Sequence, residues 1–512
     1  MMSSLFQEMI DSNKIFWLDV NKKNDNDGYL LYEMFHSDPR LIYGISKVAL
    51  SIAKSKGLKP ICIDGLRGRK ERFLLTKSMN DCSIGNFSNF LLSSVSSCPA
   101  IFRMLFSIHN KAQLLAIEID GYHIGPYIYD AALRKLNLSE ISNITSAVKK
   151  VILLELCYFY FFKKPIENLE IKTIVLGDNV YRCGLLFELA KKNNIECITP
   201  VHLNGFSMCR HVTESDFEHH DRKPDVRVLE QLDTNQINKY LESYFSKRFS
   251  ASLEQHDVMK AFSDEKTIFN RSEIIESYNL KDNLPIVIVM SHIFCDAPHA
   301  YPGMLYNDYR DWLVNTVKAL KLNPNVNFLV KEHPSADLFN ERGIINEVLR
   351  DLGCESSLLQ DNVHNLTILN EFDIVVTCGG TIGQEFSYKG KPVVLAAKPP
   401  YSGFGFTTEP HDRSSYEALM CSGIENLRRL DDQQRLMVNK VIYHDFVMLD
   451  SYSDELEIGG QRFYMGREFD DESFYGRVLT YNEVPLEEQF MYKKISSFIN
   501  SNEKHLLRGR YD

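Results

Sequence analysis

Short apolar runs alternate with amphipathic segments along most of this 512-residue chain. In the first half, apolar residues recur at helical spacing in 41–55 and 184–192, which predicts two helices. The apolar runs around them are short and bounded by turn residues, as is typical of buried strands. These runs are 15–18, 60–63, 114–119, 173–176 and 196–198.

The second half repeats the alternation more regularly. Strands are predicted at 286–290, 327–330, 358–359, 374–376 and 393–396, and helices at 309–320, 344–352, 363–370 and 382–388. Strands and helices in alternation predict parallel sheets with crossover helices. The expected fold class is therefore α/β, with two Rossmann-like doubly wound domains.

Four regions follow from this pattern. Residues 1–204 and 280–431 are the two expected Rossmann-like domains. Between them, 205–279 is polar and rich in His, Asp, Glu and Lys, and we expect helices rather than strands in this interdomain region. The tail, 432–512, is expected to be helical.

Composition limits the classes of function. A hydrophobic content of 44% in 512 residues is enough for two cores. The net charge of −10 argues against a nucleic-acid partner bound through a broad basic surface. The eleven cysteines lack paired C-x-x-C spacing, so we expect reduced thiols in a cytoplasmic protein. We expect neither a secretory signal nor a membrane-spanning helix, because no apolar run approaches about 18 residues.

The segment 373–406 carries the strongest chemical signal. An apolar strand runs into Gly379, Gly380 and Thr381, and the helix that follows carries Glu385. A strand, a glycine turn and a helix N-terminus bring backbone N–H groups together where a phosphate could bind. The alternative is an ordinary turn in which Thr381 only caps the helix.

Two further strand ends lie upstream. The strand 327–330 runs into Lys331, Glu332, His333 and Pro334, and Ser291-His292 follows the strand 286–290. In a doubly wound sheet, the carboxyl ends of the strands meet at one edge, where ligands bind. One strand end with a cationic pair and one with a glycine-threonine turn suggest a nucleotide-sugar site. We therefore expect Ser291, His292 and Lys331 near it.

The combination of KEHP, GGTIGQEF and GKPVV resembles the donor-binding half of bacterial surface-polysaccharide glycosyltransferases of the GT-B fold. More narrowly, it is similar to the capsule polysaccharide biosynthesis group that includes Kdo and sialic-acid transferases, as is SHIFCDAPHAYPGMLYNDYRDWL. The resemblance is strong from about residue 285 to 410. It implies two domains facing a cleft and a C-terminal tail that packs back on the N-terminal domain.

The resemblance also implies roles for single residues. His333 and Pro334 would contact the donor nucleotide, and His333 is also a catalytic candidate. Glu385 would accept both hydroxyls of the ribose. Family members need no metal and no cofactor, so we expect no metal site; the nucleotide sugar is a co-substrate.

The acceptor side is expected in the N-terminal domain. Related sialyltransferases place a catalytic base in an acidic-acidic-glycine motif, and EIDG matches it only in part, because Ile119 stands where one acid would be. Asp120 is the predicted base, and Glu118 would point the same way if both continue the strand 114–119. The alternative for Asp120 is a turn cap. Tyr122, His123 and Arg134 are expected to line the acceptor pocket.

The resulting hypothesis is a cytoplasmic glycosyltransferase that uses a CMP-linked acidic sugar, such as Kdo or a nonulosonate, to extend a capsule or lipopolysaccharide glycan. Its expected partners are the nucleotide-sugar donor and an oligosaccharide or glycolipid acceptor, with association to the inner membrane face left open. The alternatives are a UDP- or GDP-sugar transferase, a CDP-polyol phosphotransferase, a sugar epimerase and a non-catalytic nucleotide-sugar-binding partner.

Overall fold

The computed structural model describes residues 3–22, 27–36, 38–64, 70–80, 82–83, 87–201, 206–253, 256–451, 453–458 and 471–510. The chain divides into two compact units. Unit 1 comprises Met1–Tyr129, Asn143–Arg222 and Phe446–Asp512, and unit 2 comprises Asp130–Ser142 and Lys223–Asp445. The predicted boundary between residues 204 and 205 lies outside the described residues.

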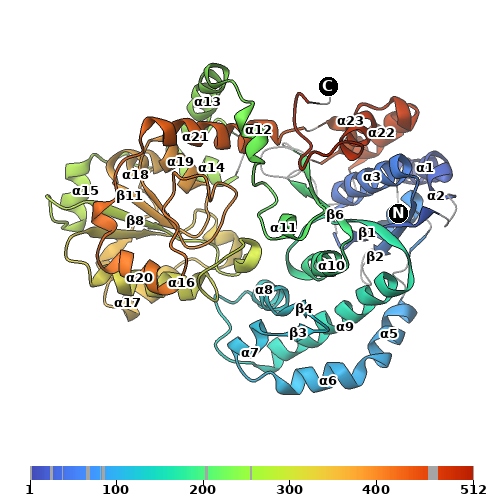
Figure 1. The fold of residues 1–512 in the computed structure, drawn as a ribbon, viewed down its shortest axis with the longest axis horizontal. Coiled ribbons are helices and arrows are strands. Elements are labelled where there is room, and N and C mark those ends of the chain that lie inside the picture. Colours follow the sequence, from blue (N-terminus) through green and yellow to red (C-terminus); the bar gives the residue numbers. More distant parts are fainter. Residues whose placement is uncertain are drawn as a thin grey trace. The chain divides into compact units, whose positions relative to one another are not determined.

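Unit 1 is built on a five-stranded sheet of order β2-β1-β5-β6-β7, of which β1, β2 and β6 are labelled in Figure 1. Its strands are β1 (Tyr29–Met34), β2 (Lys59–Asp64), β5 (Ile171–Val175), β6 (Glu196–Val201) and β7 (Ser207–His211). The first four are parallel, and β7 pairs antiparallel with β6. Helices α3 (Pro39–Lys56), α9 (Ser146–Asn168) and α10 (Tyr181–Lys192) lie between these strands in sequence.

The core beside α3 explains why the tail from Phe446 onward belongs to unit 1, whereas its first residues, 432–445, belong to unit 2. Helix α3 begins at the cap Asp38 and ends at Gly57, whose φ of 74° lies in the left-handed region. Its buried residues share one hydrophobic cluster with residues of α1 (Ser4–Phe16), α22 (Glu472–Asn482) and α23 (Phe490–Ile499). Hydrophobic burial therefore joins the first and last helices of the chain.

Three local predictions in unit 1 are wrong. Residues 15–18 lie in α1 and α2 (Leu18–Asn21) rather than in a strand. The expected strand 114–119 begins as the helix α7 (Lys111–Leu115) and keeps only β3 (Glu118–Ile119). Strand β7 falls inside the region expected to be helical. Each segment is short, so its apolar pattern does not separate helix from strand.

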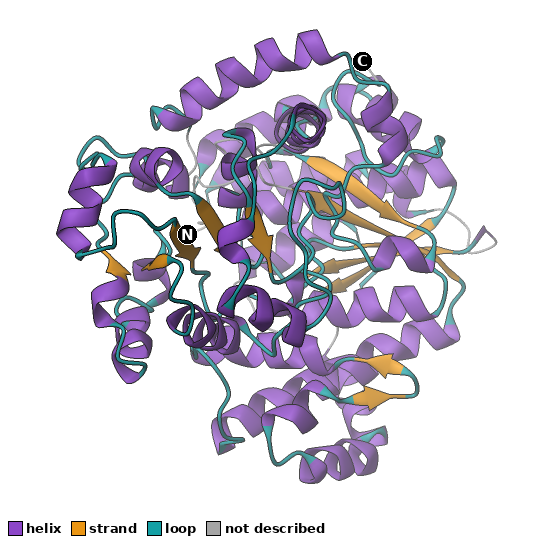
Figure 2. Ribbon diagram, turned by 60° about the vertical axis from the view of Figure 1, so that its left-hand side comes forward, coloured by secondary structure: helices purple, strands orange, loops and turns teal. Residues whose placement is uncertain are grey.

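Unit 2 contains a five-stranded sheet of order β10-β9-β8-β11-β12, and all of its strand pairs are parallel. The strands are β8 (Ile286–Met290), β9 (Asn327–Lys331), β10 (Leu358–Leu359), β11 (Ile374–Thr377) and β12 (Val393–Leu395). Between them in sequence lie α16 (Tyr309–Lys321), α17 (Ile344–Asp351), α18 (Asn365–Glu371) and α19 (Ile382–Tyr388). In Figure 2 the strands are flanked by helices. The predicted α/β class with two doubly wound sheets is confirmed, apart from the antiparallel β7.

Most of the expected interdomain region belongs to unit 2. From residue 223 onward it forms α12 (Val226–Glu230), α13 (Thr234–Phe249), α14 (His256–Ala261) and α15 (Arg271–Tyr278). Helix α13 packs against α21 (Asp432–Tyr443), as Figure 1 also shows. These helices are therefore part of the second α/β unit.

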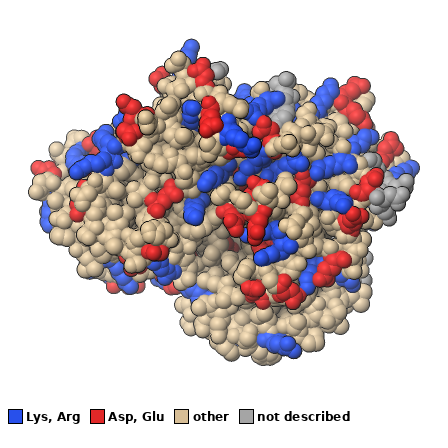
Figure 3. Space-filling model, in the orientation of Figure 1, with Lys and Arg blue, Asp and Glu red and all other residues tan. Residues whose placement is uncertain are grey.

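Unit 1 presents an apolar surface on α5 (Phe87–Ser96) and α6 (Cys98–Ser107), where Leu92, Val95 and Phe106 are exposed. Figure 3 shows few charged side chains over these helices. Among the described residues, no single helix is long and apolar enough to cross a membrane, although residues 89–107 of this bent pair meet the criterion together.

Candidate functional site

The strand order of unit 2 places a topological switch point between β8 and β11. The chain proceeds from β8 to β9 and β10 on one side, and β11 and β12 lie on the other. Ligands of open α/β sheets bind beyond the carboxyl ends of the strands at such a point. Ser291-His292 follows β8 and Gly379-Gly380-Thr381 follows β11, so the two predicted turns flank the switch point. His333-Pro334 follows the neighbouring strand β9.

His292 ties the two turns together. Its Nε2 lies 3.1 Å from Thr377 Oγ1 and accepts a hydrogen bond from the Gly379 N–H over 3.4 Å. The imidazole stacks on Tyr309, with ring centroids 4.5 Å apart. Burial, with a smaller contribution from the charge of His333, lowers the pKa of His292 to about 3. His292 is therefore neutral at physiological pH and acts in this structure as a hydrogen-bond acceptor.

The glycine turn is held from several directions. The Gly380 N–H donates to Thr377 Oγ1 over 3.3 Å, and Tyr401 donates from its hydroxyl to the Gly380 carbonyl over 2.7 Å. A Cβ on Gly379 would lie 3.0 Å from the Tyr301 ring, whereas a Cβ on Gly380 would meet only ordinary contacts of 3.4 Å or more. Close packing explains Gly379, whereas Gly380 could accept a Cβ without a clash.

Ser291 presents a buried hydroxyl beside this turn. The residue is 6% exposed, and its Oγ has no hydrogen-bond partner in the structure. The loop that follows is fixed by Glu341, whose two carboxylate oxygens accept the N–H groups of Phe294 and Cys295 over 2.7 and 2.8 Å. A buried hydroxyl without a partner is costly, and a ligand atom could remove that cost.

The end of β9 is fixed by α14. Lys260 donates from Nζ to the Pro334 carbonyl over 2.9 Å, and the Ser335 hydroxyl bonds to Asp257. His333 Nδ1 accepts the Ser335 N–H over 3.2 Å, so the neutral ring carries its proton on Nε2. Burial lowers the pKa of His333. A neutral imidazole with an Nε2–H donor can bind a phosphate oxygen or a base carbonyl.

The Lys331 side chain does not make the contact expected for it at the nucleotide-sugar site. Its side chain is buried, and Nζ donates to the Val363 carbonyl over 2.6 Å. Burial, with help from Lys266, lowers the pKa of Lys331 to about 7. The ammonium thus supports the loop before α18, a direction that strand alternation alone left undecided.

Thr381 and Glu385 lie on α19 and share one partner, Arg248 of α13. Arg248 donates from Nε to Glu385 Oε1 over 2.9 Å, and its Nη2 lies 2.7 Å from the same oxygen and 3.3 Å from Thr381 Oγ1. Burial raises the pKa of Glu385, and the Arg248 charge opposes that rise. The predicted spacing on one helix face is therefore real, but a buried guanidinium occupies one carboxylate oxygen.

Arg248 was not among the predicted site residues, although the chain contained a signal. Ile237, Leu241 and Phe245 are spaced by four residues and buried, and Arg248 continues the same stripe three residues later. A charged residue on the apolar face of an amphipathic helix needs a buried partner. The partner itself could not be read from the sequence.

The predicted acceptor-side acids lie in a hairpin of unit 1, separate from its large sheet (Figure 2). Strand β3 pairs antiparallel with β4 (Tyr122–His123), and Asp120-Gly121 forms the two-residue turn with φ values of 53° and 83°. Such values match the type I′ turn that Asp-Gly favours. Because Asp120 is not extended, the alternation argument that aligned it with Glu118 is wrong. Asp120 is exposed and ion-paired with Lys163 over 2.5 Å, and exposed Glu118 lies 3.3 Å from His123 Nδ1.

The other acceptor-side candidates divide between the units. The Tyr122 hydroxyl accepts from Asn193 over 3.0 Å, and the His123 N–H donates to Glu188 over 3.0 Å, both within unit 1. Arg134 belongs to unit 2, where its guanidinium lies over the Phe339 ring at 4.4 Å. Their role in acceptor binding stays a prediction.

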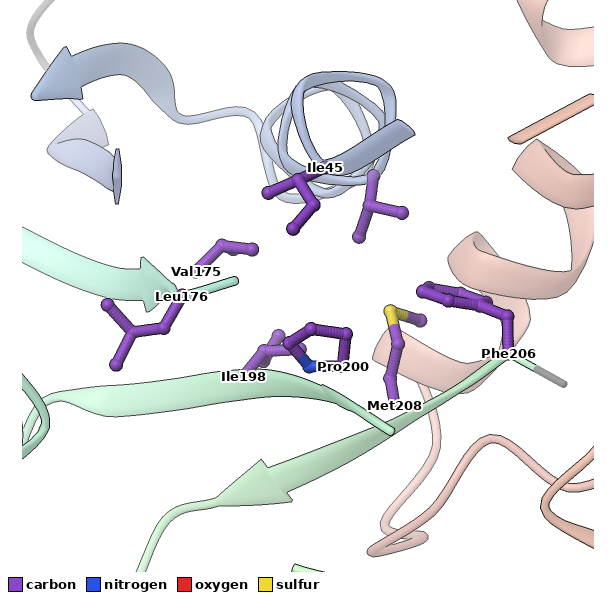
Figure 4. Close-up of a pocket in the computed structure, with 8 residues that line it drawn as sticks. Ile45, Val175, Leu176, Ile198, Pro200, Phe206 and Met208 are labelled. Atoms are coloured by element: carbon purple, nitrogen blue, oxygen red, sulfur yellow. The ribbon is translucent and has the colours of Figure 1, made fainter. Parts of the chain in front are cut away.

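A cavity in unit 1 offers no polar chemistry. Figure 4 shows its lining from α3 and the strands β5, β6 and β7. The lining residues are Ile45, Val48, Val175, Leu176, Ile198, Pro200, Phe206 and Met208. Because no polar side chain faces it, this cavity is not the nucleotide site. Among the described residues, no group of three or more His, Cys, Asp or Glu side chains could hold a metal ion.

One family model matches part of the chain. Residues 202–421 match the model of the family described as capsule polysaccharide biosynthesis protein, a range that contains all of the switch-point residues. No curated protein matches the sequence.

Solved structures give distant likenesses. The β-Kdo 2,4-transferase KpsC of Thermosulfurimonas dismutans is 13% identical, with a TM-score of 0.30 over 53% of this chain and 79% of its own. The β-Kdo 2,7-transferase of the same KpsC is 15% identical, with a TM-score of 0.27 over 54% and 78%. The UDP-GlcNAc 2-epimerase of Neisseria meningitidis is 10% identical, with a TM-score of 0.22 over 81% and 95%. Likenesses this distant carry no weight for activity.

Proposed function

We propose that this chain is a GT-B glycosyltransferase acting on a surface glycan, and the match of residues 202–421 to the capsule polysaccharide biosynthesis family model supports this. Unit 2 binds the nucleotide-sugar donor. Unit 1 supplies the acceptor side. No cofactor or metal takes part in this proposal.

One observation carries the proposal. The turns after β8 and β11 meet at the switch point of a parallel sheet, and a buried hydroxyl without a partner, Ser291 Oγ, lies there. The glycine turn after β11 lies beside it, and the β9 end offers the His333 Nε2–H. Together these groups suit a nucleotide with its phosphate at the strand ends.

The chemistry of transfer follows from these groups. As the bond between sugar and phosphate breaks, negative charge grows on the departing phosphate. Fixed donors such as the Ser291 hydroxyl and the His333 Nε2–H stabilise that charge without having to reorganise. Arg248 adds a buried positive charge beside Thr381. Asp120 remains the proposed acceptor base, and an Asp120→Asn variant in the transfer assay below tests it.

The finer parts of the proposal concern donor, acceptor and place. The donor is a CMP-linked acidic sugar, Kdo or a nonulosonate, because KEHP and its neighbouring turn resemble transferases of such sugars. The acceptor is a growing capsule or lipopolysaccharide chain. Such an acceptor grows on the cytoplasmic side, so the protein acts in the cytoplasm at the inner face of the membrane.

The first test is nucleotide binding. Titration of the full chain with CMP, CDP, UDP and GDP, followed by calorimetry and thermal shift, should show selective binding of a cytidine nucleotide. Ligand at a hundred times its Kd stabilises by about 2.7 kcal/mol. His333→Ala and Thr381→Ala should each weaken binding about 10- to 100-fold, because each removes a contact worth about 1–3 kcal/mol.

His411→Ala provides the matched control, because His411 is exposed and lies in the same unit outside the site. It should bind as the wild type does. Selectivity for UDP or GDP would refute the acidic-sugar donor and retain the site. Wild-type protein that binds none of the four nucleotides would refute the donor site itself.

A transfer assay tests the reaction. CMP-Kdo and CMP-nonulosonate are supplied with and without an oligosaccharide acceptor, and products are separated by chromatography. Transfer that requires the acceptor supports the glycosyltransferase. An isomerised sugar nucleotide formed without acceptor would instead establish an epimerase.

A further inference from the structure

Arg248 is an unusual residue for its position. It lies in the last turn of α13 on the helix's buried stripe and is only 3% exposed. Its guanidinium contacts Glu385 and Thr381 of α19, and its Nη1 lies 3.4 Å from the Tyr244 hydroxyl. A buried charge is retained only with good partners, so the Arg248–Glu385 pair constrains both side chains.

The ion pair with Arg248 gives the two carboxylate oxygens of Glu385 different hydrogen bonding. Oε1 lies within 2.9 Å of both Arg248 Nε and Arg248 Nη2. Oε2 is buried and has no hydrogen-bond partner in the structure. A buried carboxylate oxygen without a donor is costly, and a hydroxyl supplied by a ligand would satisfy it.

The attachment of α13 to α19 does not depend on this ion pair alone. Phe245 of α13 stacks on Tyr388 of α19, with ring centroids 3.8 Å apart and planes at 21°. Tyr240 of the same helix meets Tyr443 of α21 edge to face at 5.9 Å. These aromatic contacts hold α13 in place when Arg248 is replaced, so a variant can report on the site rather than on folding.

We propose that Arg248 is a positioning residue of the donor site: it occupies Glu385 Oε1 and holds Thr381, so that Glu385 meets the donor nucleotide through Oε2 alone. This inference rests on the proposed nucleotide-sugar site. It replaces the sequence-based expectation of a two-oxygen grip on the ribose with a contact to one hydroxyl.

The consequence is a difference between the two ribose hydroxyls. A carboxylate that offers each hydroxyl its own oxygen loses affinity when either hydroxyl is removed. Glu385 has only Oε2 to offer, so removal of one hydroxyl should weaken binding and removal of the other should not. Arg248→Lys keeps the positive charge but cannot hold Oε1 and Thr381 Oγ1 together, because a lysine has one nitrogen and no planar fork.

The experiment compares CMP with 2′-deoxy-CMP and 3′-deoxy-CMP by calorimetry, using the full-length wild type, Arg248→Lys and Glu385→Gln. In the wild type, one deoxy analogue should bind about tenfold more weakly than CMP and the other within about twofold. In both variants, CMP should bind about tenfold more weakly, and the two analogues should no longer differ. Arg271→Lys serves as control: Arg271 pairs with Asp373 just before β11, at the other end of the sheet.

The outcomes separate the two proposals. Equal weakening by both deoxy analogues in the wild type would overturn the single-oxygen contact without any variant, and so would equal binding of all three ligands. An Arg248→Lys protein that still distinguishes the analogues would overturn the positioning role. Binding of none of the three by the wild type would overturn the CMP site and this inference with it.

Discussion

At the scale of the residue, the charged side chains within two sequence motifs of unit 2 are buried, and their contacts differ from those that the motifs predict. Lys331 sits inside KEHP, yet its ammonium is buried and donates to Val363. Glu385 sits inside GGTIGQEF, yet Arg248 occupies one of its oxygens. In both cases the residue type was visible in the sequence, and the direction of the side chain was not.

Lys331 should make the stability of unit 2 depend on pH in the alkaline range. Its pKa in the fold, about 7, lies below its ordinary value near 10.5, so the unfolded chain binds more protons between these two values. The penalty for burying the lysine is complete below pH 7 and shrinks as the pH rises toward 10.5. The wild type should therefore gain melting temperature relative to Lys331→Met between pH 7 and pH 9.

Calorimetric melting at pH 6, 7, 8 and 9 measures that difference. Lys321→Met is the control, because Lys321 is an exposed lysine of the same unit that likewise donates to a carbonyl, that of Leu352. A constant difference between wild type and Lys331→Met across this range would contradict the lowered pKa.

At the scale of the element, the short segment Asp130–Ser142 shows how a buried charge pair can attach part of a helix. Asp130, in α8 (Gly125–Leu136), is buried and bonds to His299 Nδ1 over 2.6 Å. Burial alone lowers the pKa of His299, but the Asp130 charge raises it overall. The pair therefore attaches α8 at Asp130, the first residue of this segment, to the loop after β8.

Asp130→Asn should destabilise unit 2 by about 3–5 kcal/mol, because it leaves a buried imidazolium without its partner. A raised folded pKa means that the contribution of His299 is complete below about pH 6.5 and is lost as the pH rises through the folded value. The coupling energy from a double-mutant cycle with His299→Gln, measured in urea, should fall as the pH rises from 6 to 9.

Glu140→Gln is the matched control for that cycle. Glu140 lies in the same segment and pairs with Arg310, but both side chains are about a quarter exposed. Its removal should cost about 0–1 kcal/mol. A coupling between Asp130 and His299 of the same size would show that burial adds nothing to their pair.

At the scale of the whole molecule, the chain crosses between its two units more than once. Unit 1 is built from three separate stretches and unit 2 from two. The C-terminal helices α22 and α23 add Phe474, Met491 and Phe498 to the core of unit 1. Loss of that packing should therefore destabilise unit 1, although these residues follow unit 2 in the sequence.

Phe498→Ala should cost unit 1 about 3–5 kcal/mol, because Phe498 is fully buried in that core. Val484→Ala, at a site 42% exposed in the same tail, should change stability by less than about 0.5 kcal/mol. Calorimetry with and without nucleotide separates the units, since the ligand raises only the transition of unit 2. A Phe498→Ala protein whose nucleotide-responsive transition falls instead would contradict this assignment.

Local sequence was sufficient for the α/β class and for the strand ends of unit 2. The period of apolar residues and the glycine after a strand are properties of neighbouring residues, so Ser291, His333 and Gly379 could all be assigned to strand ends. Local sequence failed at residues 15–18 and 114–119, where a short apolar run fits helix and strand equally well.

The remaining features depend on contacts between residues far apart in the chain. The order of the strands places β8 beside β11 and so creates the switch point, although Ser291 and Ile374 are 83 positions apart in the sequence. Packing of α13 on α19 turns Glu385 toward Arg248. No single segment contains both partners of such a contact. These contacts could therefore be found only in the folded structure and not in the local sequence.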